Sequence, residues 1–472
     1  MKMILKNINI LDENFEIMEG GYLATESGKI SYVGEKKPNE KFDREIEGRG
    51  KLIIPGFVNS HCHLPMSLLR GYGESMNLQD WLFTKIFPFE EHLNGEAIYY
   101  GTLLSLAEAI KFGITSTSDM YYFMDEIAQA VTESGAKANI SRSVSHFDNS
   151  DFMSSFRAKE MIDAYEKYHD TADGRLKVDM SLHSEYTTTP IAVRQLAEYT
   201  KTINGRVQVH VSETEKEVKE CIQRHGMTPV EYLNFHGVFD VPTTAAHCVW
   251  LQNGDYDILK EKNVTVASNP ISNLKLASGV CNLGKLLDRG INVAIGTDGV
   301  ASNNNLNFVE EMKIFAISSK MMYNTPEKVT PIDTLKAATI NGAIAQGRMS
   351  TGLIKEGYCA DLVVMDIDKP YMKPVHSVQN NLVYSAVGND VEMTIVDGNI
   401  LYEKGEYKTI DIEKTDAVKF SYSDESWYTL RPSGTEPKVK LYIYVKDADK
   451  KVAEEKLVKF EEKVLELLYS ID

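Results

Sequence analysis

The stretch PGFVNSHCHLPMSLLRG, Pro55–Gly71, decides how the fold of this chain is read. A short apolar run leads into two histidines, His61 and His63, with one cysteine between them. Residues two apart in a strand face the same side, so both imidazoles would point one way and Cys62 the other. Three interpretations are open for this stretch alone: metal ligation, a nucleophilic Cys62 assisted by a histidine, and ordinary polar residues at a strand end.

The pattern of a short apolar strand followed by a helical stretch recurs after this segment. Eight such strands can be counted between residues 56 and 345: FVNSHCH, ITSTSDM, AKANISRSV, KVDMSLH, RVQVHVS, TTAAHC, VTVASNP and INVAIGTD. Strands that alternate with helices form parallel βα units, and eight units predict a closed (β/α)8 barrel of the TIM type. Polar side chains gather at the strand ends, where such barrels carry their active sites; they are His63, Asp119, Arg142, His183, His210, His247, Asn269 and Asp298.

The two ends of the chain have a different pattern of predicted secondary structure from the middle. Residues 1–55 and 346–410 contain short, largely antiparallel strand patterns with Gly-containing turns, which predict one composite β-sandwich domain built from both ends. Residues 411–472 differ again, because strand-like segments are followed by a charged helical stretch. The expected α/β architecture is therefore a barrel over residues 56–345, a composite sandwich and a small α+β C-terminal appendage.

Composition excludes several classes of partner. The formal net charge of -17 argues against nucleic acid or an anionic membrane, because both require a basic surface. The five cysteines are odd in number and lack CxxC spacing, which indicates a reducing compartment rather than a disulfide framework. No apolar run has the length of a membrane span, and the N-terminus lacks the apolar core of a secretory signal. We expect a soluble, cytoplasmic protein.

A candidate metal site emerges when the strand ends are taken together. His61 and His63 follow the first barrel strand, His210 ends the fifth, and Asp298 follows the eighth. Three imidazole nitrogens and one carboxylate oxygen match a catalytic divalent metal ion with an open position for water. Water bound to such a metal loses a proton near neutral pH.

Three of the polar residues are candidates for proton transfer beside this site. Asp298 could take a proton from water, His247 could hold the hydroxide, and Glu213 could deliver the proton to a substrate. Each residue alone has an ordinary alternative. Glu213 could be a carboxylate that stabilises the start of a helix, His247 a structural histidine, and Asp298 an aspartate in a turn. Taken together, they predict a metal-dependent hydrolase of a C–N bond.

Several segments carry a resemblance to a known family. PGFVNSHCH, HVSE, AHCVWL, SNPISNLKLASG and GTDGVASNNNLN resemble the amidohydrolase superfamily over roughly residues 1–410. Within it they are similar to the 5'-methylthioadenosine/S-adenosylhomocysteine deaminases and their chlorohydrolase-like relatives. The resemblance implies hydrolytic deamination of a 6-aminopurine nucleoside, namely S-adenosylhomocysteine, 5'-methylthioadenosine or adenosine, to the inosine analogue and ammonia. It implies one divalent metal ion, with zinc expected first and iron, nickel or manganese as alternatives.

The resemblance also implies roles for individual residues. The metal ligands it implies are His61, His63, His210 and Asp298, and the catalytic groups are Glu213, His247 and Asp298. In WLFTKIFPFEEHL it places a ribose-binding carboxylate at Glu90, which can accept hydrogen bonds from two hydroxyls. In LHSEYT it places a purine contact at His183, although the family has APYT where this chain has SEYT. Glu213 and Asp298 also face the substrate, and two substrate-binding arginines fall near Arg142 and Arg157; the alternative for these two is a surface role.

The C-terminal segment resembles a different family. YTLRPSGTEPKVKLYIYV, Tyr428–Val445, is similar to the C-terminal domain of phosphoglucomutases and phosphomannomutases, in which the RPSGTEP loop binds a sugar phosphate. The resemblance implies a phosphate or phosphosugar held by guanidinium, hydroxyl and backbone N–H donors, here Arg431, Ser433, Gly434 and Thr435. The phosphoserine segment and DxDxD loop of those mutases are absent from this sequence, so the tail alone cannot perform mutase chemistry.

Two alternatives to nucleoside deamination stay open. The same site could deaminate or dechlorinate another aromatic heterocycle, such as guanine, a pterin or a triazine. A non-catalytic protein that binds phosphorylated ligands through its tail, on a silent barrel, is the alternative from another class. The accessory β-domain offers surfaces at which chains could pair, so a homo-oligomer is also considered.

Overall fold

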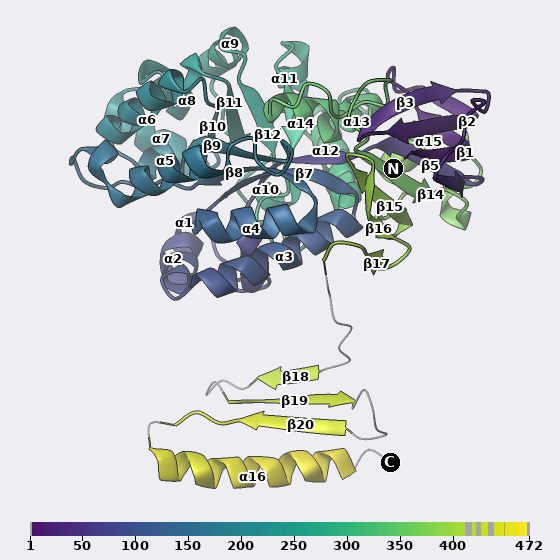
Figure 1. The fold of residues 1–472 in the computed structure, drawn as a ribbon. Helices are drawn as coiled ribbons and strands as arrows, with labels where there is room; N and C mark the ends of the chain where they lie inside the picture. Colours follow the sequence, from purple (N-terminus) through teal and green to yellow (C-terminus); the bar gives the residue numbers. More distant parts are fainter. Residues whose placement is uncertain (1, 411–417, 422–425, 433–438, 448, 470–472) are drawn as a thin grey trace. The chain divides into compact units, whose positions relative to one another are not determined.

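The computed structural model describes residues 2–410, 418–421, 426–432, 439–447 and 449–469. It contains two compact units, Met1–Ile410 and Asp411–Asp472. Figure 1 shows the larger unit as strands surrounded by helices, with a further group of strands contributed by both of its ends.

An eight-stranded parallel sheet forms the centre of the larger unit, in the order β13-β12-β11-β10-β9-β8-β7-β6. Its strands coincide with the eight expected from the sequence: β6 Phe57–Cys62, β7 Ile114–Tyr121, β8 Lys137–Arg142, β9 Leu176–Leu182, β10 Val207–Val211, β11 Thr243–His247, β12 Thr265–Ser268 and β13 Val293–Ile295. Just beyond β13, the Thr297 N–H donates to Asn59 Oδ1 at 2.9 Å and the Asp298 N–H to the His61 carbonyl at 3.0 Å. These bonds bring the two edge strands together, so the sheet is a nearly closed barrel.

Helices connect the barrel strands and cover their outer face. The longer ones are α3 Gly95–Lys111, α4 Met124–Ser134, α5 Phe156–Tyr168, α6 Pro190–Thr202, α7 Glu215–His225, α8 Pro229–Phe235, α9 Asn253–Glu261, α12 Phe308–Tyr323 and α13 Pro331–Ala338. Shorter helical segments are η1 Leu64–Leu69, α1 Leu78–Trp81, the π-helix η2 Leu82–Ile86, α2 Phe87–Glu90, η3 Phe152–Ser154, η4 Glu185–Thr187, η5 Val238–Asp240, α10 Pro270–Lys275, α11 Leu283–Asp288, α14 Ile340–Ala345, η6 Pro370–Met372, α15 Val378–Tyr384 and η7 Gly388–Asp390. Several begin at a Thr, Ser or Asn whose side chain accepts a first-turn N–H, as helix N-caps do.

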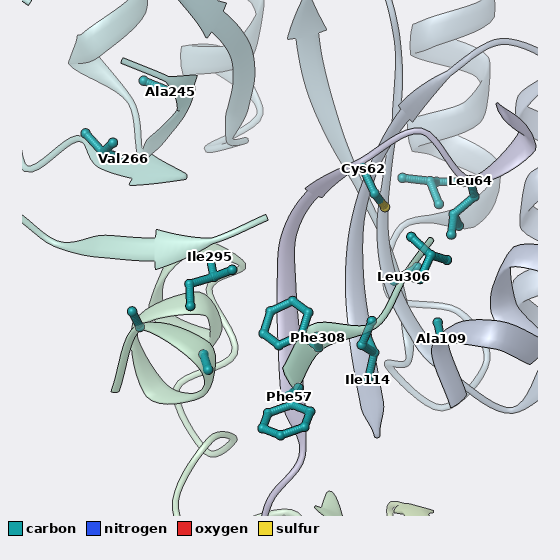
Figure 2. Close-up of a cluster of buried hydrophobic side chains, with 14 of the residues drawn as sticks. Phe57, Cys62, Leu64, Ala109, Ile114, Ala245, Val266, Ile295, Leu306 and Phe308 are labelled. Atoms are coloured by element: carbon teal, nitrogen blue, oxygen red, sulfur yellow. The ribbon is translucent and has the colours of Figure 1, made fainter. Parts of the chain in front are cut away.

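Apolar side chains fill the space between the strands and the helices (Figure 2). Phe57 of β6 stacks on Phe308 of α12 with ring centroids 5.3 Å apart. Cys62 lies in the same apolar cluster beside Leu64, and its Sγ contacts the Ser118 carbonyl at 3.4 Å. Burial raises the pKa of the Cys62 thiol well above its usual value, so this group stays a thiol. Its place in the apolar core, on the side of β6 opposite to His61, argues against a nucleophile assisted by a histidine.

Strands from both ends of the larger unit form one mixed sheet of nine strands. They are β1 Met3–Leu11, β2 Ile17–Glu26, β3 Lys29–Gly34, β4 Arg44–Glu47, β5 Lys51–Pro55, β14 Leu362–Asp366, β15 Val391–Val396, β16 Asn399–Glu403 and β17 Glu406–Tyr407. β5 pairs antiparallel with β14, which joins the two ends. The expectation of antiparallel pairing in the first 55 residues holds for β1–β2 and β2–β3 but is wrong for β4 and β5, which pair in parallel with β1. Residues 35–43 return the chain to the start of β1, so that β4 pairs with the edge of β1 that β2 does not occupy.

This sheet curves back on itself. The Ile30 N–H donates to the Tyr358 carbonyl at 2.9 Å, and the Ala360 N–H donates to the Gly28 carbonyl at 2.8 Å. Residues of β1, β2, β3, β5, β14 and β15 therefore share an apolar core separate from that of the barrel. The barrel with an additional sheet domain confirms the expected fold class. The sheet domain was expected as a sandwich of separate layers, and in the structure these layers are parts of one continuous sheet.

A lysine of the barrel forms ion pairs with two aspartates of the sheet domain. The Lys137 ammonium at the start of β8 lies 2.6 Å from Asp361 Oδ2 and 2.7 Å from Asp397 Oδ1. Lys137 and Asp361 are buried, and Asp361 also accepts a hydrogen bond from the Asp397 N–H at 2.9 Å. Buried charges are tolerated only when they are paired in this way.

The smaller unit contains an antiparallel sheet and a helix in the part of the chain that is described. The strands are β18 Val418–Ser421, β19 Trp427–Pro432 and β20 Val439–Tyr444, and the helix is α16 Lys450–Tyr469. Arg431 is in β19, whereas the other residues expected to hold a phosphate, Ser433, Gly434 and Thr435, lie outside the described residues. The phosphate site stays a prediction. None of the helices among the described residues has the length and hydropathy needed to cross a membrane.

Candidate metal centre and active site

Three histidines expected to bind a metal converge at the carboxyl ends of β6 and β10. The Nε2 atoms of His63 and His210 are 3.4 Å apart. The His61 ring lies edge-on to both, with centroids 4.9 Å from His63 and 4.7 Å from His210. One ligand atom of each of these three histidines lies within 4.8 Å of the other two. Alternation in β6 turns His61 and His63 to the same side, as the sequence predicted.

The second ring nitrogen of two of these histidines is bound to the backbone. His63 Nδ1 lies 2.7 Å from the Met120 carbonyl, and His210 Nδ1 lies 2.6 Å from the His183 carbonyl. Because a carbonyl only accepts, Nδ1 carries a proton in both rings, and Nε2 is the nitrogen that would coordinate a metal. Burial alone would lower the pKa of His63, but the hydrogen bond and charge of Asp298 raise it to about 9, so metal binding would displace a proton from its Nε2. Burial lowers the pKa of His61 and His210, which favours the neutral ring that metal binding requires.

Asp298, which follows β13, adds a carboxylate to the three histidines. Together His61, His63, His210 and Asp298 form the donor set. Asp298 Oδ1 lies 3.1 Å from His63 Nε2 and 3.7 Å from His61 Nε2. Its Oδ2 accepts hydrogen bonds from the hydroxyls of Ser272 at 2.6 Å and Ser302 at 2.9 Å. Burial alone would raise the pKa of Asp298, but the hydrogen bond and charge of His63 hold it well below its usual value. The carboxylate is therefore ionised, and one of its oxygens faces the histidines.

The donor set fits a divalent metal ion. His61 Nε2 is buried and has no hydrogen-bond partner among the described residues, and leaving a buried polar atom unsatisfied costs about 1–3 kcal/mol. A metal coordinated at this nitrogen would remove that cost. Three imidazole nitrogens with one carboxylate oxygen are a common ligand set of catalytic metal sites.

Glu213 and His247 flank the donor set. Glu213 follows β10, is buried, and has Oε2 at 3.7 Å from His247 Nε2. Its Oε1 accepts from the Ser278 hydroxyl at 3.3 Å. Burial raises the pKa of Glu213, so this carboxyl can carry a proton at higher pH than an exposed glutamic acid. The His247 ring is held through Nδ1, which lies 2.8 Å from Asn273 Oδ1.

Left-handed backbone conformations occur at three positions of this site. Ser212 has a φ of 50°, His247 a φ of 72° and Asp298 a φ of 60°. Non-glycine residues rarely adopt such angles, which cost about 1–3 kcal/mol each and cluster at functional sites. The backbone is thus strained at the two positions from which His247 and Asp298 face the three histidines.

A pocket opens above the donor set. Its floor contains His63, His210, Glu213, His247 and Asp298, and its wall is largely apolar and aromatic; the wall includes Met66, Leu78, Trp81, Leu82, Ile86, Phe87, Met120, Tyr121, Tyr122 and Tyr186. Five of the wall residues come from α1, η2 and α2, and a π-helix such as η2 is common at functional sites. An apolar and aromatic wall around a few polar groups is typical of small-molecule sites.

Two residues expected to contact a nucleoside also line this pocket. Glu90 is at the end of α2, and burial raises its pKa to about 7. His183 follows β9, and its Nδ1 lies 3.1 Å from the hydroxyl oxygens of Ser184 and Thr187. Of the two residues that depart from the family pattern, Ser184 contacts His183 and Glu185 pairs with Arg224 at 2.6 Å, and neither lines the pocket.

The two expected substrate arginines are not among the residues that line the pocket. Arg142 is buried at the end of β8, where its Nε lies 2.5 Å from Glu160 and its guanidinium lies 4.7 Å from the centre of the Tyr122 ring. Arg157 is exposed in α5. A substrate contact by either arginine stays a prediction.

Comparison with known proteins places this arrangement in a family. The model of the amidohydrolase family matches residues 52–401. The chain belongs to the amidohydrolase family. This confirms the resemblance drawn from the segments around His61, His210 and Asp298.

Individual members resemble this amidohydrolase over most of their length. A 5-methylthioadenosine/S-adenosylhomocysteine deaminase from Thermoanaerobacter pseudethanolicus is 42% identical over 417 residues, which are 88% of this chain and 96% of that protein. A 5'-deoxyadenosine deaminase from Methanothermobacter thermautotrophicus is 40% identical over 412 residues, 86% and 96% of the two chains. An adenosine deaminase structure from Xanthomonas campestris with bound zinc has a TM-score of 0.81 at 28% identity and covers 87% of this chain and 94% of its own.

The amidohydrolase site also contains residues that sequence reasoning missed. Ser272 and Ser302 donate to the Asp298 carboxylate, Asn273 contacts the His247 ring, and Glu217 accepts the backbone N–H of Glu213. Ser272 and Asn273 lie in α10, which follows β12 in the segment SNPISN, and Ser302 lies shortly after Asp298. Their closeness to strand ends was the available signal. Their partners became clear only from the closed barrel.

Proposed function

We propose that this amidohydrolase catalyses the hydrolytic deamination of a 6-aminopurine nucleoside. The candidate substrates are 5'-methylthioadenosine, S-adenosylhomocysteine, 5'-deoxyadenosine and adenosine, and the products are the inosine analogue and ammonia. The observation that carries the proposal is the arrangement of two carboxyl groups in one pocket. Glu213 lies beside the histidine–aspartate donor set, and Glu90 lies on α2 in the pocket wall. The names of the relatives support the same substrate class.

The donor set would hold one divalent ion. His61, His63, His210 and Asp298 are the proposed ligands, and zinc is the first choice because the Xanthomonas campestris structure contains it. When bound, such an ion supplies a water molecule that loses its proton near neutral pH.

Asp298 and His247 would prepare the attack on the purine. Asp298 would accept a proton from the attacking water through Oδ1, the oxygen that faces the histidines, because Oδ2 is occupied by the hydroxyls of Ser272 and Ser302. His247 is fixed through Nδ1, which leaves Nε2 to orient the attacking oxygen toward C6 of the purine. Oriented groups of this kind lower the entropy cost of the reaction.

Glu213 would act as the proton donor. Its carboxyl gives a proton to ring nitrogen N1, so that C6 can accept the attacking oxygen. The proton held by Asp298 then passes to the amino group, the C6–N bond breaks and ammonia leaves, and the hydroxyl proton at C6 returns to Glu213 as the carbonyl forms. One water is consumed for each ammonia released, and the new carbonyl oxygen comes from that water.

The pocket wall would select a nucleoside. The rings of Trp81 and Phe87 and the side chains of Leu82 and Ile86 provide a surface for the flat base and for an apolar 5' group. The ionised Glu90 carboxylate can accept hydrogen bonds from two ribose hydroxyls, because carboxylate oxygens only accept.

Ammonia release from metal-loaded protein tests this proposal. The four nucleosides and guanine are each added as a substrate, and ammonia and the ultraviolet spectrum of the base are followed with and without a chelator. We expect turnover of at least one nucleoside, no turnover of guanine, and loss of activity with the chelator. Turnover of guanine alone would favour the heterocycle alternative, and no turnover of any compound would favour the non-catalytic alternative.

A further inference from the structure

Glu217 is a buried carboxyl group in the first turn of α7 that does not line the pocket. Only 1% of its surface is exposed. Its Oε1 accepts the Ser212 N–H at 2.8 Å, and its Oε2 accepts the Glu213 N–H at 2.8 Å. One carboxylate therefore holds two successive peptide groups immediately before the helix.

This arrangement goes beyond the usual role of a glutamate at the third position of a helix. The Thr214 hydroxyl accepts the Glu217 N–H at 3.2 Å, as at an ordinary helix start, but the Glu217 carboxylate also accepts the N–H groups of Ser212 and Glu213. In α8 of the same chain, Glu231 accepts the N–H of the N-cap residue Thr228 at 2.8 Å, and the Thr228 hydroxyl accepts the Glu231 N–H at 3.1 Å. That reciprocal pair stabilises a helix start and nothing else. Glu217 reaches one and two residues further back, to the segment that carries Glu213.

The segment held by Glu217 joins the metal site to the proton donor. Ser212 lies between His210 and Glu213 and has a left-handed φ of 50°. Its carbonyl accepts the N–H of Val249 at 3.0 Å and of Trp250 at 2.9 Å, just after His247. The conformation that directs Glu213 toward His247 thus depends on hydrogen bonds from both sides of Ser212.

Placing Glu217 in this position has a cost. Burial, and then the charge of Glu213, raise the pKa of Glu217 to about 8. A buried carboxyl next to a second one is unfavourable unless N–H groups satisfy it. An apolar residue at this position would avoid the burial penalty but would leave the N–H groups of Ser212 and Glu213 without this acceptor.

We propose that Glu217 is a positioning residue, which fixes the backbone of Glu213 so that its side chain points at the substrate. This inference rests on the proton-donor role proposed for Glu213. Glu217 itself contacts neither the substrate nor the metal ligands. Its effect on the reaction passes entirely through Glu213.

The first test is the substitution Glu217→Gln in the full-length, metal-loaded protein. The glutamine oxygen can accept one N–H, but its amide group faces the other N–H as a second donor. We expect kcat to fall by about 10- to 100-fold with KM within about threefold, as for the loss of an interaction that acts in the transition state. Metal content should stay that of the wild type. Unchanged kcat would overturn the proposal.

Glu231→Gln is the matched control. It removes a carboxylate from the same position of α8, where the acceptor serves only the helix start. We expect a lower melting temperature and unchanged kcat. If Glu217→Gln does not fold, Glu217→Asp replaces it, because the shorter side chain keeps the charge but cannot reach both N–H groups. Wild-type kcat in that variant would also overturn the proposal.

A double variant separates positioning from a general structural role. If Glu217 acts only through Glu213, adding Glu217→Gln to Glu213→Gln leaves the residual rate unchanged, because the group being positioned is already lost. Multiplication of the two losses would contradict the proposal. Absence of wild-type deamination, measured first, would refute the proposed function instead, so the two failures can be told apart.

Discussion

The backbone N–H of Asp298 donates to the carbonyl oxygen of His61 at 3.0 Å. This bond joins the segment after β13 to the end of β6, so it closes the barrel and brings two proposed metal ligands together. The Asn59 side chain reinforces the closure, since its Oδ1 accepts the Thr297 N–H at 2.9 Å and its Nδ2 donates to the Thr297 hydroxyl at 2.7 Å. The geometry of the donor set is thus a consequence of closing the sheet.

Replacing Asn59 by leucine should loosen this closure. The change removes both hydrogen bonds to Thr297 and leaves a buried N–H unsatisfied, which should lower the free energy of unfolding by about 1–3 kcal/mol. Because Asp298 follows Thr297 directly, metal should also dissociate faster. Urea unfolding and competition with a chromogenic chelator measure the two effects. Wild-type metal retention in this variant would separate barrel closure from metal binding.

Replacing Glu213 by glutamine should abolish proton donation and leave the metal site intact. Glutamine keeps the size of the side chain but cannot supply an acidic proton, so kcat should fall by at least about 100-fold. Bound metal, measured by mass spectrometry, should equal that of the wild type, because Glu213 is not a proposed ligand. Wild-type turnover in Glu213→Gln would remove this residue from its assigned role.

Nucleoside binding should strengthen as the pH rises through 7. Burial raises the pKa of Glu90 to about 7, so below this pH Glu90 is protonated and offers fewer acceptor sites to the ribose hydroxyls. If the ionised form binds, KM should fall by about tenfold between pH 6 and pH 8. Steady-state kinetics across this range measure the effect.

Two controls isolate Glu90 from the other titrating groups. Glu90→Gln should raise KM and flatten its pH dependence, because glutamine does not titrate. A 2'-deoxynucleoside should show a smaller change of KM with pH in the wild type, since it has one hydroxyl fewer to donate. A full pH dependence of KM in Glu90→Gln would assign the effect to another group.

Replacing Lys137 by methionine should destabilise the attachment of the sheet domain. Asp361 would lose its buried partner, and removing one member of a buried ion pair costs about 3–5 kcal/mol. Thermal unfolding should therefore begin at a lower temperature. Lys328→Met is the matched control, because the Lys328–Asp288 pair is solvent-exposed and should leave the melting temperature unchanged. Equal shifts in the two variants would contradict a special role for Lys137.

The parts predicted from the sequence are those that depend on local pattern. The eight barrel strands were found because apolar runs alternate with helical stretches, and His61, His63 and His210 were found because they end such strands. Alternation within β6 also separated Cys62 from the histidines, since neighbouring residues of a strand face opposite sides.

The parts that were not predicted depend on contacts between distant segments. The parallel pairing of β4 and β5 with β1 follows from the path of residues 35–43, which carries no pairing signal of its own. The pairing of Arg142 with Glu160 requires α5 to pack beside β8. Ser272 and Ser302 gain their roles only when both surround the Asp298 carboxylate.

Deamination as a function of bound metal tests the central claim most directly. Metal-free protein is titrated with zinc, and ammonia release from the preferred adenosine analogue is measured at each point together with the metal content. Activity should rise in proportion to bound metal and level off at one ion per chain, with no further increase beyond it. Full activity in the metal-free protein, or no release from any of the four nucleosides with one ion bound, would contradict a single-metal hydrolytic deaminase.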